Sequence, residues 1–222
     1  MYSIYLFKES IVATYNIIIS CDPGVTGGIS ILDGKKIPIV YKMPVRDVIV
    51  NKKKKKEYDL DVILSILEPY RSKLKKVLYI QEKVQSMPGE GSVSSFKFGK
   101  SSGMTIGLAI GLNFTVVEVS PQKWKKEFPE LITASIIKNK TEIKQLRLKS
   151  KTLKDKEQKK QNKKSIEKLG RQIKTEAKTA ARELVSKKYP KLIDKFKKKN
   201  TDGMAESLLI AIYGRKNQNE LV

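Results

Sequence analysis

The feature that most restricts the fold is a short apolar run that ends in an acidic, glycine-containing turn. Tyr15–Cys21 contains three consecutive isoleucines, a pattern typical of a buried strand. Asp22, Pro23 and Gly24 follow directly and favour a turn. In α/β folds, the carboxyl ends of the strands are where side chains gather into a ligand-binding crevice. The run therefore favours an α/β protein with a site near Asp22.

The segments that follow predict a mixed sheet. Ile29–Leu32 and Ile37–Met43 are apolar runs separated by an Asp-Gly turn, so a meander of three antiparallel strands is expected. Val77–Gln81 and Thr115–Val119 have the length and composition of strands, and a helical pattern precedes each of them. This order favours an α/β fold in which a five-stranded mixed sheet is flanked by helices on both faces.

Helical patterns account for most of the remaining chain. The run Lys52–Lys56 is the exception, and we expect it to be a solvated loop. The first predicted helix begins at Asp59 or Asp61 and ends near Leu67. Further helices are predicted at about Ser94–Leu112, Gln122–Phe128, Lys174–Lys188 and Asp202–Tyr213.

The composition changes between residues 133 and 174. Aromatic residues are absent there, lysine dominates, and apolar residues recur at loosely helical spacing. A charged helical hairpin or a partly disordered helix is expected, inserted into a single domain. The predicted organisation is a leader or edge segment at 1–14, one domain at 15–216 interrupted by the Lys-rich insertion 133–174, and a tail at 217–222.

Charge and composition restrict the classes of function. The formal net charge is +23, which favours a polyanionic partner, and no apolar run is long enough to span a membrane, so nucleic acid is preferred. The chain has no histidine, which excludes histidine-ligated zinc and histidine general bases. The single cysteine, Cys21, cannot form an intramolecular disulfide and is interpreted as a small buried side chain.

Three further acids stand where an α/β fold would bring them towards Asp22. Glu82 directly follows the strand Val77–Gln81, and Asp202 and Glu206 are four residues apart, so they share one face of the last helix. Taken singly, Asp22 is also explained as an ordinary turn residue, and Glu82 as the point at which a strand meets solvent. An Asp-x-Gly turn after a first strand also occurs in sugar kinases, where it handles phosphate.

Clustered carboxylates suit hard divalent cations. Oxygen donors of this kind favour Mg²⁺ or Mn²⁺. Two such ions about 4 Å apart would activate a water molecule and stabilise the leaving oxygen of a phosphodiester. Acids that hold metal inside a strongly basic chain indicate a nuclease.

Five motifs follow one another along the chain, beginning at Cys21, Ile80, Ser95, Val119 and Asp202. In this order they resemble the motifs of the RuvC family of Holliday junction resolvases, which has a ribonuclease H-like fold. The resemblance covers roughly residues 15–130 and 175–216. The final Ala-Ile-Tyr-Gly-Arg segment is most similar to the plant-organelle branch. The motifs are Cys21–Gly28, Ile80–Val84, Ser95–Gly103, Val119–Lys125 and Asp202–Ala211.

The resemblance implies a crossover junction endonuclease that nicks four-way DNA junctions symmetrically. It implies two Mg²⁺ ions per site, with Mn²⁺ as a substitute, and a cationic Lys125 or Lys123 near the scissile phosphate. The chain departs from the bacterial branch in the spacing of its last acid pair, and the insertion has no counterpart in the family. The implied metal ligands are Asp22, Glu82, Asp202 and Glu206.

A glycine repeat and several aromatic and basic residues extend the expected site. Four glycines recur every four residues and share one helix face, which predicts either packing on the sheet or the interface of a homodimer. Phe96 and Phe98 cannot both face one core, so one of them is a candidate for stacking on a base. The glycines are Gly99, Gly103, Gly107 and Gly111, and the expected DNA-binding residues are Lys83, Phe96, Phe98, Lys100 and Lys123.

Other interpretations remain open from the sequence. The chain could be another ribonuclease H-like nuclease that cuts flaps or RNA–DNA hybrids, or a junction-binding protein without catalytic activity. A sugar-kinase-like enzyme is more distant, because no second phosphate-binding turn is found. An intracellular location is expected, without a choice between organellar, viral and bacterial origins.

Overall fold

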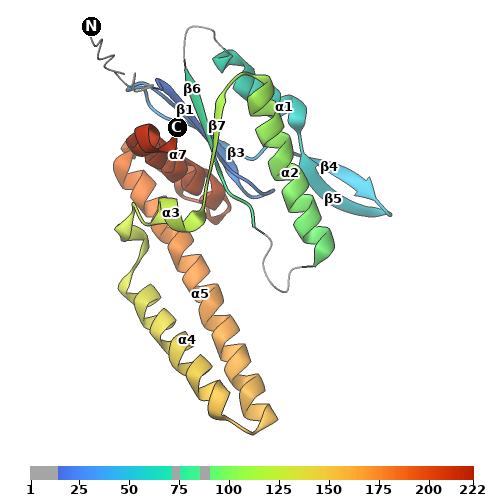
Figure 1. Cartoon of the computed structure of the whole chain (residues 1–222), viewed down its shortest axis with the longest axis vertical. Coiled ribbons are helices and arrows are strands. Elements are labelled where there is room, and N and C mark those ends of the chain that lie inside the picture. The colour runs from blue at the N-terminus through green and yellow to red at the C-terminus, as the bar shows by residue number, and fades with distance from the viewer. Residues whose placement is uncertain (1–14, 72–75, 86–90) are drawn as a thin grey trace, which may run out of the picture.

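Five strands form the central sheet, and their order places distant parts of the chain side by side (Figure 1). In the computed structural model, which describes residues 15–71, 76–85 and 91–222, the order is β3-β2-β1-β6-β7. β1, β2 and β3 are antiparallel neighbours, whereas β1, β6 and β7 are parallel. The predicted α/β fold with a mixed five-stranded sheet is confirmed, and the expected leader lies outside the described residues. The strands are β1 (Ile17–Asp22), β2 (Gly28–Asp33), β3 (Ile39–Lys42), β6 (Val77–Glu82) and β7 (Thr115–Val119).

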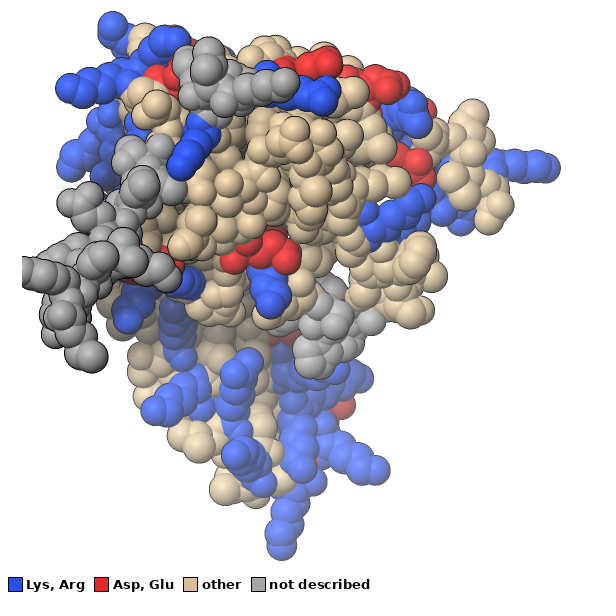
Figure 2. Space-filling model, turned by 45° about the horizontal axis from the view of Figure 1, so that its top comes forward, with Lys and Arg blue, Asp and Glu red and all other residues tan. Residues whose placement is uncertain are grey.

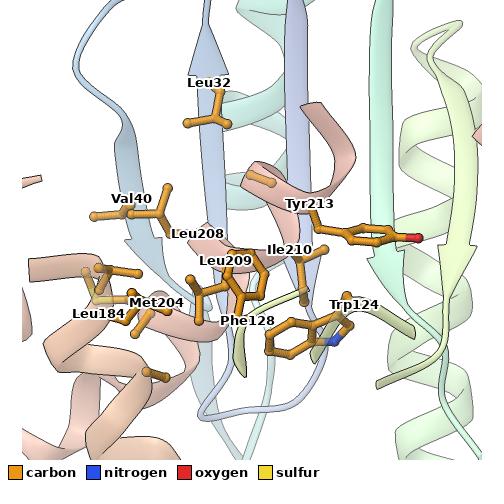
Figure 3. Packing of buried hydrophobic residues seen from close by; sticks show 14 of the residues in the cluster. Leu32, Val40, Trp124, Phe128, Leu184, Met204, Leu208, Leu209, Ile210 and Tyr213 are labelled. Atoms are coloured by element: carbon orange, nitrogen blue, oxygen red, sulfur yellow. The ribbon is translucent and has the colours of Figure 1, made fainter. Parts of the chain in front are cut away.

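One face of the sheet is covered by three helices from the second half of the chain. Successive side chains of a strand point to opposite faces, so Ile18 and Ile80 share this face. They pack with α3 (Pro121–Lys125), α5 (Lys156–Lys188) and α7 (Asp202–Leu221). Figure 3 shows the side chains of this layer, in which α7 lies directly against the sheet.

The opposite face is covered by α1 (Leu60–Leu67) and α2 (Ser92–Gly111). Ile19 and Tyr79 point into this second core. Cys21 is also fully buried here, and burial raises the pKa of its thiol to about 12. The cysteine is therefore an inert part of the core, as interpreted from the sequence.

The expectation of a solvated loop at Lys52–Lys56 is wrong. These lysines belong to a two-stranded hairpin of β4 (Val45–Val50) and β5 (Lys53–Tyr58). Asn51 and Lys52 both have positive φ, as a two-residue hairpin turn requires. The lysine run concealed the strand because charged residues are tolerated on a strand whose outer edge faces solvent.

The insertion is a helical hairpin, which we call the arm. It consists of α4 (Ala134–Thr152) and the first half of α5. Half-buried residues repeat at alternating spacings of three and four along both helices, the pattern of a coiled-coil seam. Within the seam, the Asn162 side-chain amide donates a hydrogen bond to the Ser150 hydroxyl (3.1 Å). The other seam residues are Ile143, Leu146, Leu153, Ile166, Leu169 and Ile173.

α5 runs without interruption from the arm into the domain. The helix expected at Lys174–Lys188 is therefore the second half of one 33-residue helix. The expected tail at 217–222 is also helical as far as Leu221, beyond a kink of α7 at Asn217. The remaining short elements are η1 (Glu68–Tyr70), η2 (Pro129–Leu131), η3 (Pro190–Leu192), α6 (Ile193–Phe196) and η4 (Lys199–Thr201).

The turn after β1 and the start of α7 approach each other at backbone distance. A Cβ atom on Gly203 would lie 2.3 Å from the carbonyl oxygen of Thr26, and one on Gly28 would lie 2.8 Å from the Cα of Met204. Only glycine fits at such separations. This contact brings the first turn of α7 beside the end of β1.

Gly203→Ala should destabilise the protein by about 1–3 kcal/mol, because the new methyl group would force the turn and α7 apart. Thermal unfolding should show a melting temperature lower by roughly 2–4 °C per kcal/mol. The control is Gly170→Ala in α5, where a Cβ meets no atom within 4 Å, so stability should rise by up to about 1 kcal/mol. Equal melting temperatures for the two variants would contradict the close contact.

Candidate active site

The four acids predicted from the sequence come from three elements that meet at one end of the sheet. Asp22 ends β1 and Glu82 ends β6, and because these strands are parallel neighbours their carboxyl ends coincide. Asp202 and Glu206 lie in the first turns of α7, which packs against β1 and against the turn that follows it. The side chains of Asp22, Glu82 and Glu206 are close enough to perturb one another electrostatically.

Asp22 lies at the centre of this acidic group. Burial raises the pKa of its carboxyl group well above the usual range, and the negative charges of Glu206 and Glu82 add to the effect. The nearby cations Lys125 and Lys178 oppose it only in part. Within the part of the chain that the structure describes, no hydrogen bond or ion pair reaches the Asp22 carboxylate. The charge of an ionised Asp22 is therefore costly and only partly compensated.

A buried tryptophan holds Glu82 in place. The indole N–H of Trp124 donates a hydrogen bond to Oε2 of Glu82 (2.6 Å), and the ring is fully buried with its edge against Phe128. Burial and the charge of Glu206 raise the pKa of Glu82, whereas the Trp124 hydrogen bond and Lys125 lower it. Trp124 is not among the site residues expected from the sequence. Its contact with a site residue was missed, although it is the only tryptophan in the chain.

Lys125, rather than Lys123, faces the acids. The ammonium group of Lys125 lies 3.1 Å from Oε1 of Glu206 and 4.9 Å from the centre of the Trp124 ring. Burial alone would lower the pKa of Lys125, but the surrounding carboxylates, above all Glu206, raise it, so the side chain stays charged. Lys123 is exposed, and its backbone N–H donates a hydrogen bond to the hydroxyl of Ser120, which caps α3.

Asp202 is held by two cations from α5 that sequence reasoning missed. Nε of Arg182 lies 2.9 Å from Oδ1 of Asp202, and Nζ of Lys178 lies 3.7 Å from Oδ2. One signal was present in the sequence. Arg182 is one of only six arginines in this lysine-rich chain and stands beside apolar residues of α5, where arginine suits a buried ion pair better than lysine does.

The acids match a hard divalent cation in chemistry but are not arranged as a finished metal centre. Among residues 15–71, 76–85 and 91–222, no three acidic or cysteine side chains converge as metal ligands do. Lys125 lies beside Glu206, and Arg182 lies beside Asp202. The only partly compensated charge at Asp22, next to Glu82, is nevertheless one that a bound cation would stabilise.

The residues expected to bind DNA differ in how far their side chains are exposed. Phe96 has 72% of its surface exposed, whereas Phe98 is half-buried near Gly24, so the two do indeed differ in environment. Lys83 and Lys100 are exposed.

The four glycines of α2 do not pack on the sheet, because a Cβ at any of them would meet no atom within 4 Å.

The sheet order defines an α/β protein of the ribonuclease H-like type, with its acids at the carboxyl ends of the central parallel strands. No family model matches the chain, and no curated protein matches it.

Two solved structures of RuvC resemble the chain in fold. One is Thermus thermophilus RuvC in complex with a Holliday junction substrate, at 10% identity over 93% of this chain and 96% of that chain, with a TM-score of 0.47. Another is a Thermus thermophilus RuvC structure at 15% identity over 50% of this chain and 67% of that chain, with a TM-score of 0.31. Neither supports the expected closeness to the plant-organelle branch.

Asp22→Asn should stabilise the protein at neutral pH when divalent cations are chelated. Because the pKa of Asp22 is raised, the folded protein holds this proton more tightly than the unfolded chain does. The stability associated with the proton is present below about pH 4 and is lost as the pH rises through the raised pKa. The neutral amide avoids that loss, so the melting temperature of the variant should exceed that of the wild type by a few degrees. Each kcal/mol of added stability corresponds to roughly 2–4 °C.

Thermal melts of both proteins at about pH 4 and about pH 7 test this linkage. The difference should shrink at the lower pH, where the wild-type carboxyl group is itself protonated in the folded state. A variant that is less stable than the wild type at pH 7 would show that the Asp22 carboxylate is well compensated.

Proposed function

We propose that the protein is a divalent-metal-dependent endonuclease that resolves four-way DNA junctions. The observation that carries the proposal is the meeting of Asp22, Glu82 and Glu206 with Lys125 at the carboxyl ends of the parallel strands. The net charge of +23 supports a polyanionic substrate. The five sequence motifs that resemble RuvC support a Holliday junction as that substrate.

Asp22, Glu82, Glu206 and Asp202 are the residues that would hold the cation, and two Mg²⁺ ions per site are proposed, with Mn²⁺ as a substitute. When bound, such ions lower the pKa of a water molecule and neutralise the charge that develops on the phosphate. Asp22 is the central ligand in this proposal, because Lys125 and Lys178 offset its raised pKa only in part and no ion pair in the described part of the chain reaches its carboxylate.

The surrounding side chains orient and balance the acids. Trp124 fixes one oxygen of Glu82 and leaves the other available. Lys125 is a charged donor at the rim of the acidic group, where it can stabilise negative charge on a phosphate oxygen in the transition state. Arg182 sets the position of Asp202 and is a positioning residue rather than a catalytic one.

Exposed residues near the site are proposed to contact DNA. Phe96 presents its ring to solvent and is the better candidate for stacking on an unpaired base at the branch point. Phe98 is half-buried and would contribute less contact area. Lys83, Lys100 and Lys123 are exposed and are proposed as phosphate contacts.

The exposed glycine face of α2 is proposed as the interface of a homodimer. Gly99, Gly103, Gly107 and Gly111 leave an open surface that a second helix can approach closely. A symmetric dimer would place two sites on opposed strands of a junction, which itself has approximate two-fold symmetry.

Two further expectations from the sequence stay predictions: the similarity to the plant-organelle branch and the intracellular location. In the described part of the chain, no helix combines the length and apolar character that a membrane span needs.

A cleavage assay separates the proposed function from its alternatives. The protein is incubated with Mg²⁺ and a labelled four-way junction, a flap or an RNA–DNA hybrid. Paired nicks across the junction are expected, and Asp22→Asn should slow them by at least about 100-fold, since even indirect partners of metal ligands change activity 10- to 100-fold. Asp194→Asn on α6 removes an exposed carboxylate and should leave the rate unchanged.

Each alternative predicts a different outcome of that assay. Equal cutting of all three substrates would indicate a less selective ribonuclease H-like nuclease. Tight binding of the junction without cleavage in Mg²⁺ or Mn²⁺ would indicate a binding protein and would refute the enzymatic proposal.

Gly107→Leu should disrupt the proposed dimer, because the added side chain would separate two helices in close contact. Light scattering should give about twice the chain mass of 25.2 kDa for the wild type and the chain mass itself for the variant. Gly170→Leu, which also adds a side chain at an open helix position, should remain dimeric. A Gly107→Leu protein that is still dimeric would refute this interface.

A further inference from the structure

The arm concentrates positive charge to an unusual degree. Between Lys138 and Lys174 there are 15 Lys and Arg residues and only 4 Asp and Glu residues, so these 37 residues hold a net +11 of the chain's +23. Figure 2 shows basic side chains crowding this part of the molecule, below the mainly uncharged surface of the domain. Like charges at this density repel one another unless a polyanion lies against them.

The apolar residues of the arm are used in its own seam. The two helices pack through one narrow row of half-buried side chains each, so little apolar surface remains for insertion into a lipid layer. Ile137 and Leu148 are more than half exposed, but they stand singly among polar residues. A cationic, mainly polar rod fits a phosphate backbone better than it fits a membrane.

A row of cations on α4 provides a defined contact surface. Lys140, Lys144, Arg147 and Lys151 are spaced four, three and four residues apart, so they lie on one side of the helix, and all are exposed. Together they line one shallow depression of the surface. The row spans about 16 Å at 1.5 Å per residue, a length over which a DNA duplex presents roughly ten phosphates.

The continuity of α5 fixes the distance from the acids to the tip of the arm. Arg182 contacts Asp202, and Lys156 at the start of the same helix lies 26 residues earlier. That separation is about 39 Å along a helix, or about 11–12 base pairs of duplex at about 3.4 Å each. Figure 1 shows the arm projecting beyond the end of the domain at which β6 and β7 finish.

We propose that the arm binds the phosphate backbone of a DNA duplex as it leaves the site, over about 11–12 base pairs, and that the α4 row is a main contact. The position of the duplex relative to the acids rests on the proposed function, whereas the binding of duplex DNA by the arm does not. The contact is to backbone, so it is independent of sequence.

The test compares two variants with the same loss of charge. The arm variant is K140Q/K144Q/R147Q/K151Q, and the control is K187Q/K188Q/K191Q/K195Q, which changes exposed lysines at the opposite end of α5 and just beyond it. Glutamine keeps the helix propensity of the residues it replaces. Both sets are made in the Asp22→Asn protein, so that binding is measured without cleavage, and circular dichroism checks that the helices persist.

Dissociation constants are measured for junctions with arms of about 6 and about 18 base pairs, and for linear duplexes, at several salt concentrations. The unmutated arm should favour the long junction, and the arm variant should lose at least about tenfold in affinity for it. The log–log salt slope should become shallower by about 3–4, from four lost phosphate contacts at about 0.9 each. The control, and binding of the short junction, should change little.

The proposal is overturned if the arm variant and the control behave alike, or if the loss is equal for short and long arms. Loss of binding to phosphatidylserine vesicles without any dependence on DNA length would assign the arm to a lipid surface instead. A second assay measures cleavage of the short junction by proteins that retain Asp22. It tests the proposed nuclease function separately from the binding of duplex DNA by the arm. If no junction is cut but the arm variant still loses duplex binding, the proposed function fails and the arm proposal stands.

Discussion

The backbone contact between the turn after β1 and the first turn of α7 is the constraint on which the site depends. Gly28 and Gly203 allow two chain segments almost 180 residues apart to touch without intervening side chains. The contact fixes where α7 begins, and hydrogen bonds from Ser20 and Ser30 to Ser207 hold its next turn against β1 and β2. Glu206 is carried to Asp22 by this backbone packing, and not by any attraction between the two acids, which repel one another.

Electrostatic strain and its relief then determine the character of the site. Burial and, in second place, the nearby carboxylate charges raise the pKa of Asp22 and Glu82, and the protein offsets this effect with Lys125 and with the cations of α5. The compensation is uneven, since Asp202 has two cationic neighbours and Asp22 has no direct partner among the described residues. Carboxyl groups whose pKa values are raised by burial and by neighbouring charges cluster at functional sites.

Much of the fold could be predicted because its signals are local. The isoleucine run, the Asp-Gly turn and the matched β7 segment follow from strand propensity and turn chemistry, and the residues that end β1 and β6 must share an edge once those strands are parallel. The partners of Arg182 and Trp124 could not be predicted, because they depend on the packing of α5 and α3 against the sheet. The β4–β5 hairpin was missed because four successive lysines open β5, and only Tyr58 at its end is buried in the core.

The seam of the arm has a consequence for how the protein could diversify. Its contacts repeat every seven residues, so removing or adding one repeat in each helix would preserve the packing and leave Arg182 and everything beyond it in place. Each such step changes the reach of the arm by about 10 Å, close to three base pairs of duplex. The length of the arm can thus change in steps of seven residues in each helix, by small insertions or deletions, without disturbing the residues of the site at its base.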